Sequence, residues 1–351
     1  MADTVDTTDT PGYDKEAVDA WIRENIEGLE PPFTWTRLVG GHSNLTFALV
    51  DQAGRSAVIR RPPLGELLPK AHDMGREFTV IKALGPTPVP VPIAYGYCED
   101  PAVTGAHFYV MSQVDGQAFY TAEEVEANLS IESRVRLSNS FMDTLAALHA
   151  LDPIELGIGD LGRHDGYVGR QLRTWYGSWE ASKEAAAFDD PRLHELHDML
   201  LSNLPVQGPP RVVHGDYGTH NVMVGPDGII TAVLDWEIAT LGDPMADFAY
   251  ALNAWVDQDD DLSYAPFAAT SAPGFLRRDE LIARYADATG CDLSLLGYYR
   301  TFNYFKTACI LHGVYARYRM GQKSTEGVDM DGLLNRMGGS IELALNQARD
   351  L

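Results

Sequence analysis

The chain has 351 residues, of which 45% are hydrophobic and 22% charged, so it is long enough for a soluble protein with two lobes, each with its own core. Fifty acidic residues against 27 basic ones leave a formal net charge of −23, which argues against nucleic acid and anionic membranes as partners because both would repel the chain. No apolar run reaches the roughly 20 residues that cross a bilayer, and three cysteines without metal-ligand spacing indicate reduced thiols, so we expect a cytoplasmic protein.

The first predicted segment is a disordered tail over residues 1–12, which is small, polar and rich in Thr and Asp. The tail is acidic rather than basic and then apolar, so it does not resemble a signal peptide. From Tyr13 to Leu29 apolar residues recur at helical spacing, which predicts an amphipathic helix that Pro31-Pro32 ends.

Three short strands with glycine turns are predicted between Phe33 and Arg61. The third strand, Ser56 to Arg61, ends in two arginines. Since successive side chains of a strand point to opposite faces, only one of Arg60 and Arg61 points inward. A helix from Ala71 to Leu84 follows, and it carries Glu77 among apolar residues. Extended chain over the proline-rich residues 85–92 then leads to strands over 93–98 and 108–114.

Helices dominate the second half of the prediction. Apolar spacing places them at Ile131–Ala150, Asp165–Glu180, Leu293–Met320 and Asp331–Leu351. The aromatic residues Trp175, Tyr176 and Trp179 on the second of these helices are expected in the core. The third helix is rich in Tyr and Phe, and one of its faces is a candidate wall of an apolar substrate pocket.

The stretch from Val212 to Glu237 gathers polar side chains between two apolar runs. His214-Gly215-Asp216 follows the first run, Asn221 comes five residues after Asp216, and the second run ends at Asp235. The turn Gly225–Gly228 between β-branched residues predicts a hairpin, which would carry Asn221 and Asp235 to one end beside Asp216.

Three oxygen-bearing side chains that lie close together can bind a metal ion and accept a proton. A carboxylate beside a hydroxyl orients it and accepts its proton, and an amide with a second carboxylate suits Mg²⁺. Phosphoryl transfer from ATP needs these parts, with Asp216 as the catalytic residue and Asn221 and Asp235 as metal ligands. The alternative is a buried hairpin with a polar turn, which has no chemistry.

The motif HGDYGTHN followed by LDWE resembles the catalytic loop and metal-binding turn of the aminoglycoside phosphotransferase family, small-molecule kinases that share the protein-kinase fold. The resemblance extends from about residue 33 to residue 320. It implies an α+β, bilobal protein-kinase-like fold, with a β-rich N-lobe for nucleotide binding over 13–114 and a mainly helical C-lobe for catalysis and substrate binding over 115–351.

The resemblance also implies roles for single residues, with ATP and Mg²⁺ as the cofactors. The nucleotide would be held by a phosphate-binding turn, an ion pair of Arg60 with Glu77, and a hinge that binds adenine through main-chain groups. Met111 would control access behind the adenine. The implied contacts are Gly41, Ser43, Asn44, Arg60, Glu77, Met111, Gln113 and Val114. Structural support would come from His214, Asp243 and Asp247, which brace the catalytic loop. An exposed surface position is the alternative for Glu77.

Two features depart from most of the family. Arg60 stands where a lysine is usual, and an arginine keeps the charge while changing the geometry toward phosphate. The sequence FNYFKTACILHGVYAR, residues 302–317, is similar to the closing helix of the kinase-like domains fused to some acyl-CoA dehydrogenases. A nucleotide-binding pseudoenzyme is therefore the alternative to a phosphotransferase, whereas a protein kinase would need a long activation segment after Asp235.

The acceptor is predicted only as a hydroxyl on a small molecule. An aminoglycoside, a sugar or choline-like alcohol, and a hydroxyacyl thioester all fit the motifs, and the apolar closing helix favours a metabolic compound. The net charge and the acidic residues Asp257–Asp261 would attract a polycation, although such acidity also serves solubility alone. No pattern in the sequence indicates an oligomeric state.

Overall fold

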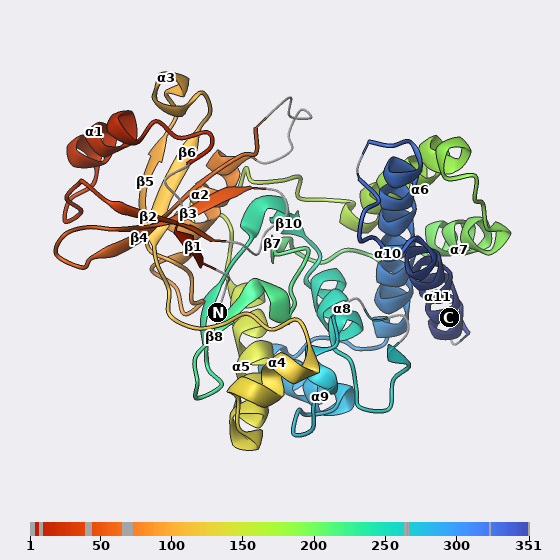
Figure 1. The fold of residues 1–351 in the computed structure, drawn as a ribbon. Helices are drawn as coiled ribbons and strands as arrows, with labels where there is room; N and C mark the ends of the chain where they lie inside the picture. The colour runs from red at the N-terminus through yellow and green to blue at the C-terminus, as the bar shows by residue number, and fades with distance from the viewer. Residues whose placement is uncertain are drawn as a thin grey trace. The chain divides into compact units, whose positions relative to one another are not determined.

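An antiparallel sheet and a group of long helices divide the chain into two units in the computed structural model (Figure 1). The structure describes residues 4–6 by their backbone and residues 10–38, 44–64, 73–262, 265, 267–322 and 324–349 in full. The sheet unit comprises Met1–Ala118, Leu156–Ile158 and Asn221–Ala239, and the helical unit comprises the rest. The first boundary lies near the predicted one at 114, but the central hairpin belongs to the sheet unit.

The sheet unit contains six antiparallel strands in the order β1-β2-β3-β4-β6-β5. The strands are β1 (Thr4–Asp6), β2 (Thr34–Leu38), β3 (Leu45–Val50), β4 (Ser56–Arg61), β5 (Ala94–Cys98) and β6 (Phe108–Ser112). The predicted three-stranded meander is confirmed, because β2 pairs with β3 and β3 pairs with β4. The region around the predicted turn at 101–105 contains a short helix, α3 (Pro101–Thr104).

Two longer helices pack against this sheet, α1 (Lys15–Asn25) and α2 (Met74–Leu84). Asp14 begins α1, since its side chain accepts hydrogen bonds from the main-chain N–H groups of Glu16 and Ala17. Val18 and Ile22 of α1 are buried with Ile59 of β4. The alternation of β4 then directs Arg60 to the opposite face of the sheet, which is where α2 lies.

The N-terminal tail differs from the prediction where the structure describes it. Residues 4–6 form β1, which pairs with the edge of β2 in the register Thr4 to Leu38 and Asp6 to Thr36. Composition indicates a polar segment but does not exclude β-branched residues from adding a strand to an open sheet edge.

The helical unit contains four helices that the sequence predicted, with ends shifted by a few residues: α5 (Ile131–Ala150), α6 (Tyr167–Ala186), α10 (Leu296–Arg319) and α11 (Met330–Ala348). It also contains α4 (Ala122–Asn128), α7 (Pro191–Ser202), α8 (Pro244–Ala254) and α9 (Arg278–Thr289). A short strand, β7 (Arg211–Val213), pairs with β10 (Thr240–Gly242). The described helices include none that is both long and apolar enough to span a membrane.

The predicted central hairpin is present between β8 (Val222–Val224) and β9 (Ile230–Val233). The turn is closed by hydrogen bonds from Gly225 N to Ile229 O (2.9 Å) and from Gly228 N to Gly225 O (2.9 Å). The apolar run of β7 therefore takes no part in this hairpin and pairs with β10 instead.

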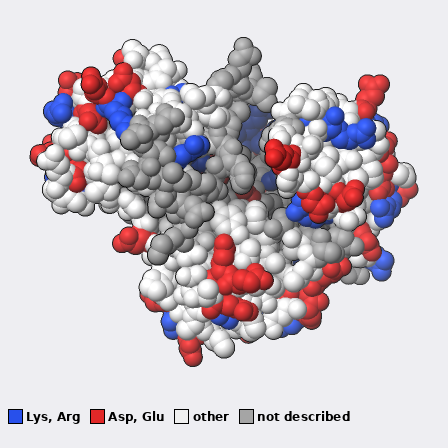
Figure 2. Space-filling model, in the orientation of Figure 1, with Lys and Arg blue, Asp and Glu red and all other residues white. Residues whose placement is uncertain are grey.

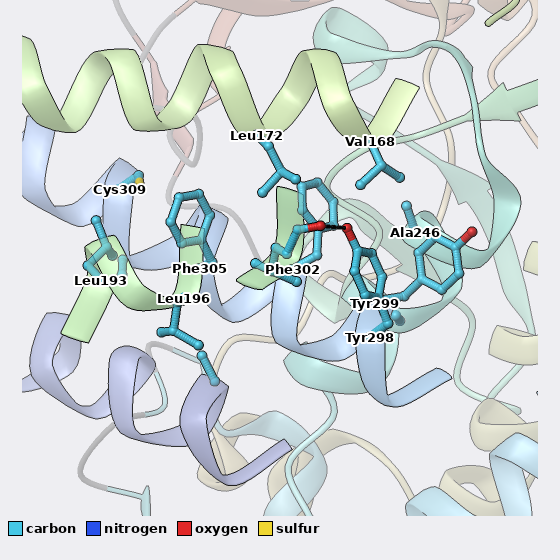
Figure 3. Close-up of a cluster of buried hydrophobic side chains, with 14 of the residues drawn as sticks. Val168, Leu172, Leu193, Leu196, Ala246, Tyr298, Tyr299, Phe302, Phe305 and Cys309 are labelled. Atoms are coloured by element: carbon cyan, nitrogen blue, oxygen red, sulfur yellow. Dashed lines mark hydrogen bonds between the residues drawn. The ribbon is translucent and has the colours of Figure 1, made fainter. Parts of the chain in front are cut away.

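The aromatic face of α10 forms the core of the helical unit. Phe302 and Phe305 are buried against Leu172 of α6 and Leu196 of α7 (Figure 3). Trp179 belongs to the same cluster, with Trp175 and Tyr176 partly buried around it. The expectation that this face lines a substrate pocket is wrong, because its rings are covered by α6, α7 and α11.

Truncation of Phe305 tests this assignment. Because the side chain is fully buried, Phe305→Ala is expected to lower the free energy of unfolding by about 3–5 kcal/mol. Urea denaturation measures the change. Tyr315→Ala on the same helix is the control, and it should cost less because Tyr315 is only half-buried. An equal loss in the two variants would contradict the core assignment.

Candidate active site

The sheet unit carries a buried arginine that forks between two carboxylates. Arg60 Nη1 donates to Glu77 Oε1 at 2.6 Å, and Arg60 Nη2 donates to Asp235 Oδ1 at 3.0 Å. The Glu77 side chain is 1% exposed and that of Asp235 is 34% exposed. The predicted Arg60–Glu77 ion pair is thus present, and an exposed position for Glu77 is ruled out.

Arg61 points to the opposite face of β4. Its side chain donates to the main-chain oxygens of Pro62 (3.2 Å) and Thr104 (2.7 Å) and also to that of Gly12. Strand alternation therefore separates the two arginines as expected, and only Arg60 joins the acidic pair.

The neighbouring carboxylates keep the Arg60 guanidinium protonated. Burial disfavours the charged guanidinium, but the carboxylates of Glu77 and Asp235 outweigh this and raise the pKa of Arg60 above its usual value. Arg60 is therefore a fixed positive charge with one nitrogen on each acid.

Removal of this charge would leave Glu77 buried without a counter-ion. Arg60→Met is expected to destabilise the protein by about 3 kcal/mol in urea denaturation. Arg37→Met on β2 is the matched control, because Arg37 is exposed on the same sheet, and its effect should stay below about 0.5 kcal/mol. Equal stability of the two variants would show that the Arg60 ion pair is not structural.

The hairpin brings the two predicted metal ligands together. Leu234 N donates to Asn221 O at 2.8 Å, and Val222 lies opposite Val233 in the ladder. Asp235 follows directly in a left-handed conformation, with φ 63° and ψ 59°. That backbone is unfavourable for a residue other than glycine and is common at functional sites, where surrounding contacts hold it.

The donor set of the hairpin end fits Mg²⁺. An amide oxygen and a partly exposed carboxylate are hard oxygen ligands, and Mg²⁺ usually takes only one or two protein carboxylates beside waters and substrate phosphates. The described residues include no group of three or more His, Cys, Asp and Glu side chains placed to hold a metal. Asn221 and Asp235 would hold Mg²⁺ together with waters and substrate phosphates.

The other predicted nucleotide contacts are only partly described. Gly41 and Ser43 lie outside the described residues. Asn44 Nδ2 donates to Glu237 Oε2 at 3.3 Å, so Asn44 lies beside the Asp235 turn. Met111 is buried at the end of β6, and Gln113 and Val114 follow the strand as exposed and half-buried residues. Their contact with adenine stays a prediction.

Asp216, in the helical unit, accepts two side-chain contacts. The Tyr250 hydroxyl donates to Asp216 Oδ1, and His220 Nε2 lies 3.5 Å from Asp216 Oδ2. Burial favours the neutral acid, but the hydrogen bonds from His220 and Tyr250 and the charge of His220 lower the pKa of Asp216 to about 2. Asp216 is therefore ionised at neutral pH, with a side chain that is 35% exposed.

A buried carboxylate braces the loop that carries Asp216. Asp247 Oδ2 and Oδ1 accept hydrogen bonds from the main-chain N–H groups of His214 and Gly215, both at 2.7 Å. His149 Nε2 lies 3.2 Å from the same carboxylate. Asp243 caps α8 by accepting from Met245 N at 3.0 Å. Asp247 thus has the predicted bracing geometry, and Asp243 supports the helix that carries it.

The environment of Asp216 contains three residues that the sequence analysis missed. His220 and Tyr250 contact its carboxylate, and Lys306 Nζ donates to Gly215 O at 3.1 Å. His220 could have been predicted from the sequence, because it lies in the motif four residues after Asp216. Lys306 was visible as a lysine among apolar residues, whereas Tyr250 had no sequence signal beyond its place in an apolar helix.

The acidic loop at 257–261 is paired within its own unit. Asp259 forms an ion pair with Arg277 at 3.1 Å, and Asp257 lies 3.6 Å from Arg278, which also pairs with Asp260. Arg278 is the first residue of α9, and Arg277 directly precedes it. Acidic side chains lie on both units in the face shown in Figure 2, so the net charge is not confined to this loop.

Comparison with known proteins identifies the family. The model of the phosphotransferase enzyme family APH matches residues 34–281, more than half of the 351 residues. The chain belongs to this family. The match includes Asp216, the hairpin with Asn221 and Asp235, and the strand and helix that carry Arg60 and Glu77. The sheet and helical units of this APH-family chain also confirm the predicted α+β kinase-like fold.

Individual relatives agree with this assignment. Acyl-CoA dehydrogenase family member 11 of Gallus gallus is 38% identical over 296 residues, which cover 82% of this chain and 37% of that protein. The chain thus spans well under half the length of this curated relative. A crystal structure from Ralstonia eutropha JMP134, whose name assigns it to the aminoglycoside phosphotransferases, is 30% identical with a TM-score of 0.81 and covers 96% of this chain and 98% of that one.

A more distant structure shares the fold alone. Spectinomycin phosphotransferase in complex with ADP and spectinomycin is 12% identical, with a TM-score of 0.60, and covers 96% of this chain and 98% of that one. The predicted resemblance to aminoglycoside phosphotransferases and to the kinase-like part of acyl-CoA dehydrogenase family members is confirmed.

Proposed function

We propose that the protein transfers the γ-phosphoryl group of ATP to a hydroxyl group of a small molecule, in the presence of Mg²⁺. The observation that carries the proposal is the fork of Arg60 between Glu77 and Asp235, beside Asn221 at the hairpin end. This group retains the positive charge, the acidic partner of that charge and the two oxygen ligands that phosphoryl transfer requires. The ADP complex of the fold relative supports a nucleotide site.

Each side chain has a role that follows from its chemistry. Asp216 is a weak base because its pKa is about 2, so its main task is to orient the acceptor hydroxyl and to accept the proton late, as the oxygen becomes acidic. Arg60 would place a fixed charge at the phosphates. Asn221 and Asp235 would hold Mg²⁺, which neutralises phosphate charge when it is bound.

We further propose that the acceptor is a hydroxyacyl thioester. The curated relatives that contain this kinase-like part are named acyl-CoA dehydrogenases, which points to thioester chemistry in the same polypeptide. Asp257, Asp259 and Asp260 already form ion pairs with Arg277 and Arg278, which argues against this loop as the binding site of a polycationic aminoglycoside.

A screen for phosphate transfer tests both the phosphotransferase function and the identity of the acceptor. The protein is incubated with Mg²⁺ and γ-labelled ATP and, in turn, with hydroxyacyl-CoA compounds, aminoglycosides, and sugar or choline-like alcohols. Label is expected in the hydroxyacyl-CoA product only. Transfer to another class would overturn the thioester proposal while retaining the phosphotransferase.

The rival function is a nucleotide-binding pseudoenzyme. It is favoured by Arg60 in the place of the usual lysine, with both terminal nitrogens engaged by carboxylates. Calorimetric titration with Mg-ATP separates the two functions when combined with the screen. Tight nucleotide binding without transfer to any acceptor class, in wild type and in Arg60→Lys, would support the pseudoenzyme.

A further inference from the structure

We propose that Tyr250 and Lys306 are a positioning pair for Asp216, which holds its carboxylate in the direction from which it meets the acceptor hydroxyl. The role of this pair in catalysis rests on the proposed phosphotransferase function. Its effect on the orientation and the pKa of the Asp216 carboxylate is independent of that function. The two residues come from α8 and α10, which pack against each other in the helical unit.

Tyr250 fixes one side of the carboxylate. Its hydroxyl donates to Asp216 Oδ1, so that oxygen already has a charge-assisted hydrogen bond. His220 Nε2 contacts the other oxygen, Oδ2, at the longer distance of 3.5 Å. The Tyr250 contact therefore sets the direction in which the carboxylate points.

Lys306 fixes the main chain beneath the carboxylate. Its ammonium group donates to Gly215 O at 3.1 Å, while Gly215 N donates to Asp247 Oδ1 at 2.7 Å. The peptide groups on both sides of Gly215 are thus held, and the residue has a φ of 85°, which favours glycine. Asp216 follows directly, so its backbone position is set by these two contacts.

Lys306 also holds Tyr250. The ammonium nitrogen lies 5.1 Å from the centroid of the Tyr250 ring, within the range of a cation–π contact. Lys306 is only 7% exposed, and a buried lysine is costly unless its charge has a specific use. Burial lowers the pKa of Lys306, and the negative charges of Asp216 and Asp247 act in the opposite direction.

The groups that face Asp216 come from several segments. His220 lies in η1 (Thr219–Asn221), His214 on the same loop, Tyr250 and Asp247 on α8, and Lys306 on α10. Burial raises the pKa of Asp216, whereas the contacts with His220 and Tyr250 lower it. Loss of the Tyr250 hydroxyl should therefore weaken the preference for the ionised carboxylate as well as its orientation.

Carboxyl NMR tests the pair without any acceptor. The full chain is labelled at the Asp side-chain carboxyl carbons and titrated without nucleotide or Mg²⁺, and the Asp216 signal is the one that Asp216→Asn removes. In Tyr250→Phe the midpoint of this signal is expected to rise by roughly one pH unit. An unchanged midpoint in the folded variant would overturn the proposal.

Tyr299→Phe is the matched control, because its hydroxyl donates to another buried carboxylate of the same unit, Asp243, at 2.6 Å. This variant should leave the Asp216 signal unchanged; an equal shift there would show that any lost tyrosine hydroxyl has the same effect and would overturn the specific role of Tyr250. Lys306→Met should also raise the midpoint, because a nearby positive charge is lost, and Lys306→Arg should restore it.

Kinetics give a second readout once an acceptor is known. Tyr250→Phe is expected to lower kcat by about 10- to 100-fold, with an unchanged KM for ATP, since a misdirected carboxylate loses orientation rather than nucleotide binding. An unchanged kcat would overturn the catalytic meaning of the pair. A protein without phosphotransfer activity would still give the NMR result, so the failure of the proposed function and the failure of the pair are distinguishable.

Discussion

Asp216→Asn is expected to lower the phosphotransfer rate by about 10²- to 10⁴-fold. The amide keeps the size of the side chain and accepts a hydrogen bond from Tyr250, but it loses the negative charge that orients the acceptor hydroxyl and receives its proton. The affinity for Mg-ATP should stay within a few-fold of wild type, because the proposed phosphate contacts lie on other residues. Single-turnover measurements with γ-labelled ATP would determine the rate, and calorimetry the affinity.

Asp165→Asn is the matched control for this substitution. The Asp165 side chain is 99% exposed in the same unit, so the same loss of charge should leave the rate unchanged. A wild-type rate in Asp216→Asn would remove Asp216 from the mechanism, whereas a loss of Mg-ATP binding would show that the residue acts on the nucleotide instead.

Asp247→Ala is expected to destabilise the helical unit by about 5 kcal/mol. The substitution leaves the main-chain N–H groups of His214 and Gly215, and the ring of His149, buried without their acceptor. Urea denaturation followed by near-UV circular dichroism measures the change. Asp247→Asn keeps one acceptor oxygen and should lose less, so equal losses in the two variants would contradict the hydrogen-bond account.

The same residue predicts a dependence of stability on pH. Burial raises the pKa of Asp247, but the hydrogen bonds and charges of His149 and His214 outweigh this and leave it below the usual value. The folded state therefore binds this proton less readily than the unfolded chain. The stabilisation is present above the unfolded pKa and is lost as pH falls through the folded one, so wild type should lose more stability in acid than Asp247→Ala.

The polar motifs were predictable because the chemistry requires those residue types at short separations along the chain. Asp216, Asn221 and Asp235 stand out as polar residues beside apolar runs, and strand alternation alone limited the inward arginine to one of two. Glu77 was predicted from its place among apolar residues of a helix. Each of these inferences depends on local geometry that a short stretch of sequence determines.

The features that the sequence did not predict depend on packing between segments that are distant along the chain. Helix α10 buries aromatic and polar residues on several sides, so its sequence pattern could not distinguish a core face from a pocket wall. The contacts of Tyr250 with Asp216 and of Lys306 with Gly215 depend on the packing of α8 against α10, which the sequence did not predict. β10 is only three residues long, too short for a periodic signal.

The sheet unit is assembled from three separate stretches of the polypeptide, and Asn221–Ala239 comes from the middle of the chain. A recombinant fragment that stops at the first boundary would therefore lack Asn221 and Asp235 and would leave Arg60 and Glu77 without their hairpin partner. Limited proteolysis at any one boundary would not release either unit whole. Attempts to isolate a nucleotide-binding half would need to splice Asn221–Ala239 back onto residues 1–118 through a designed linker.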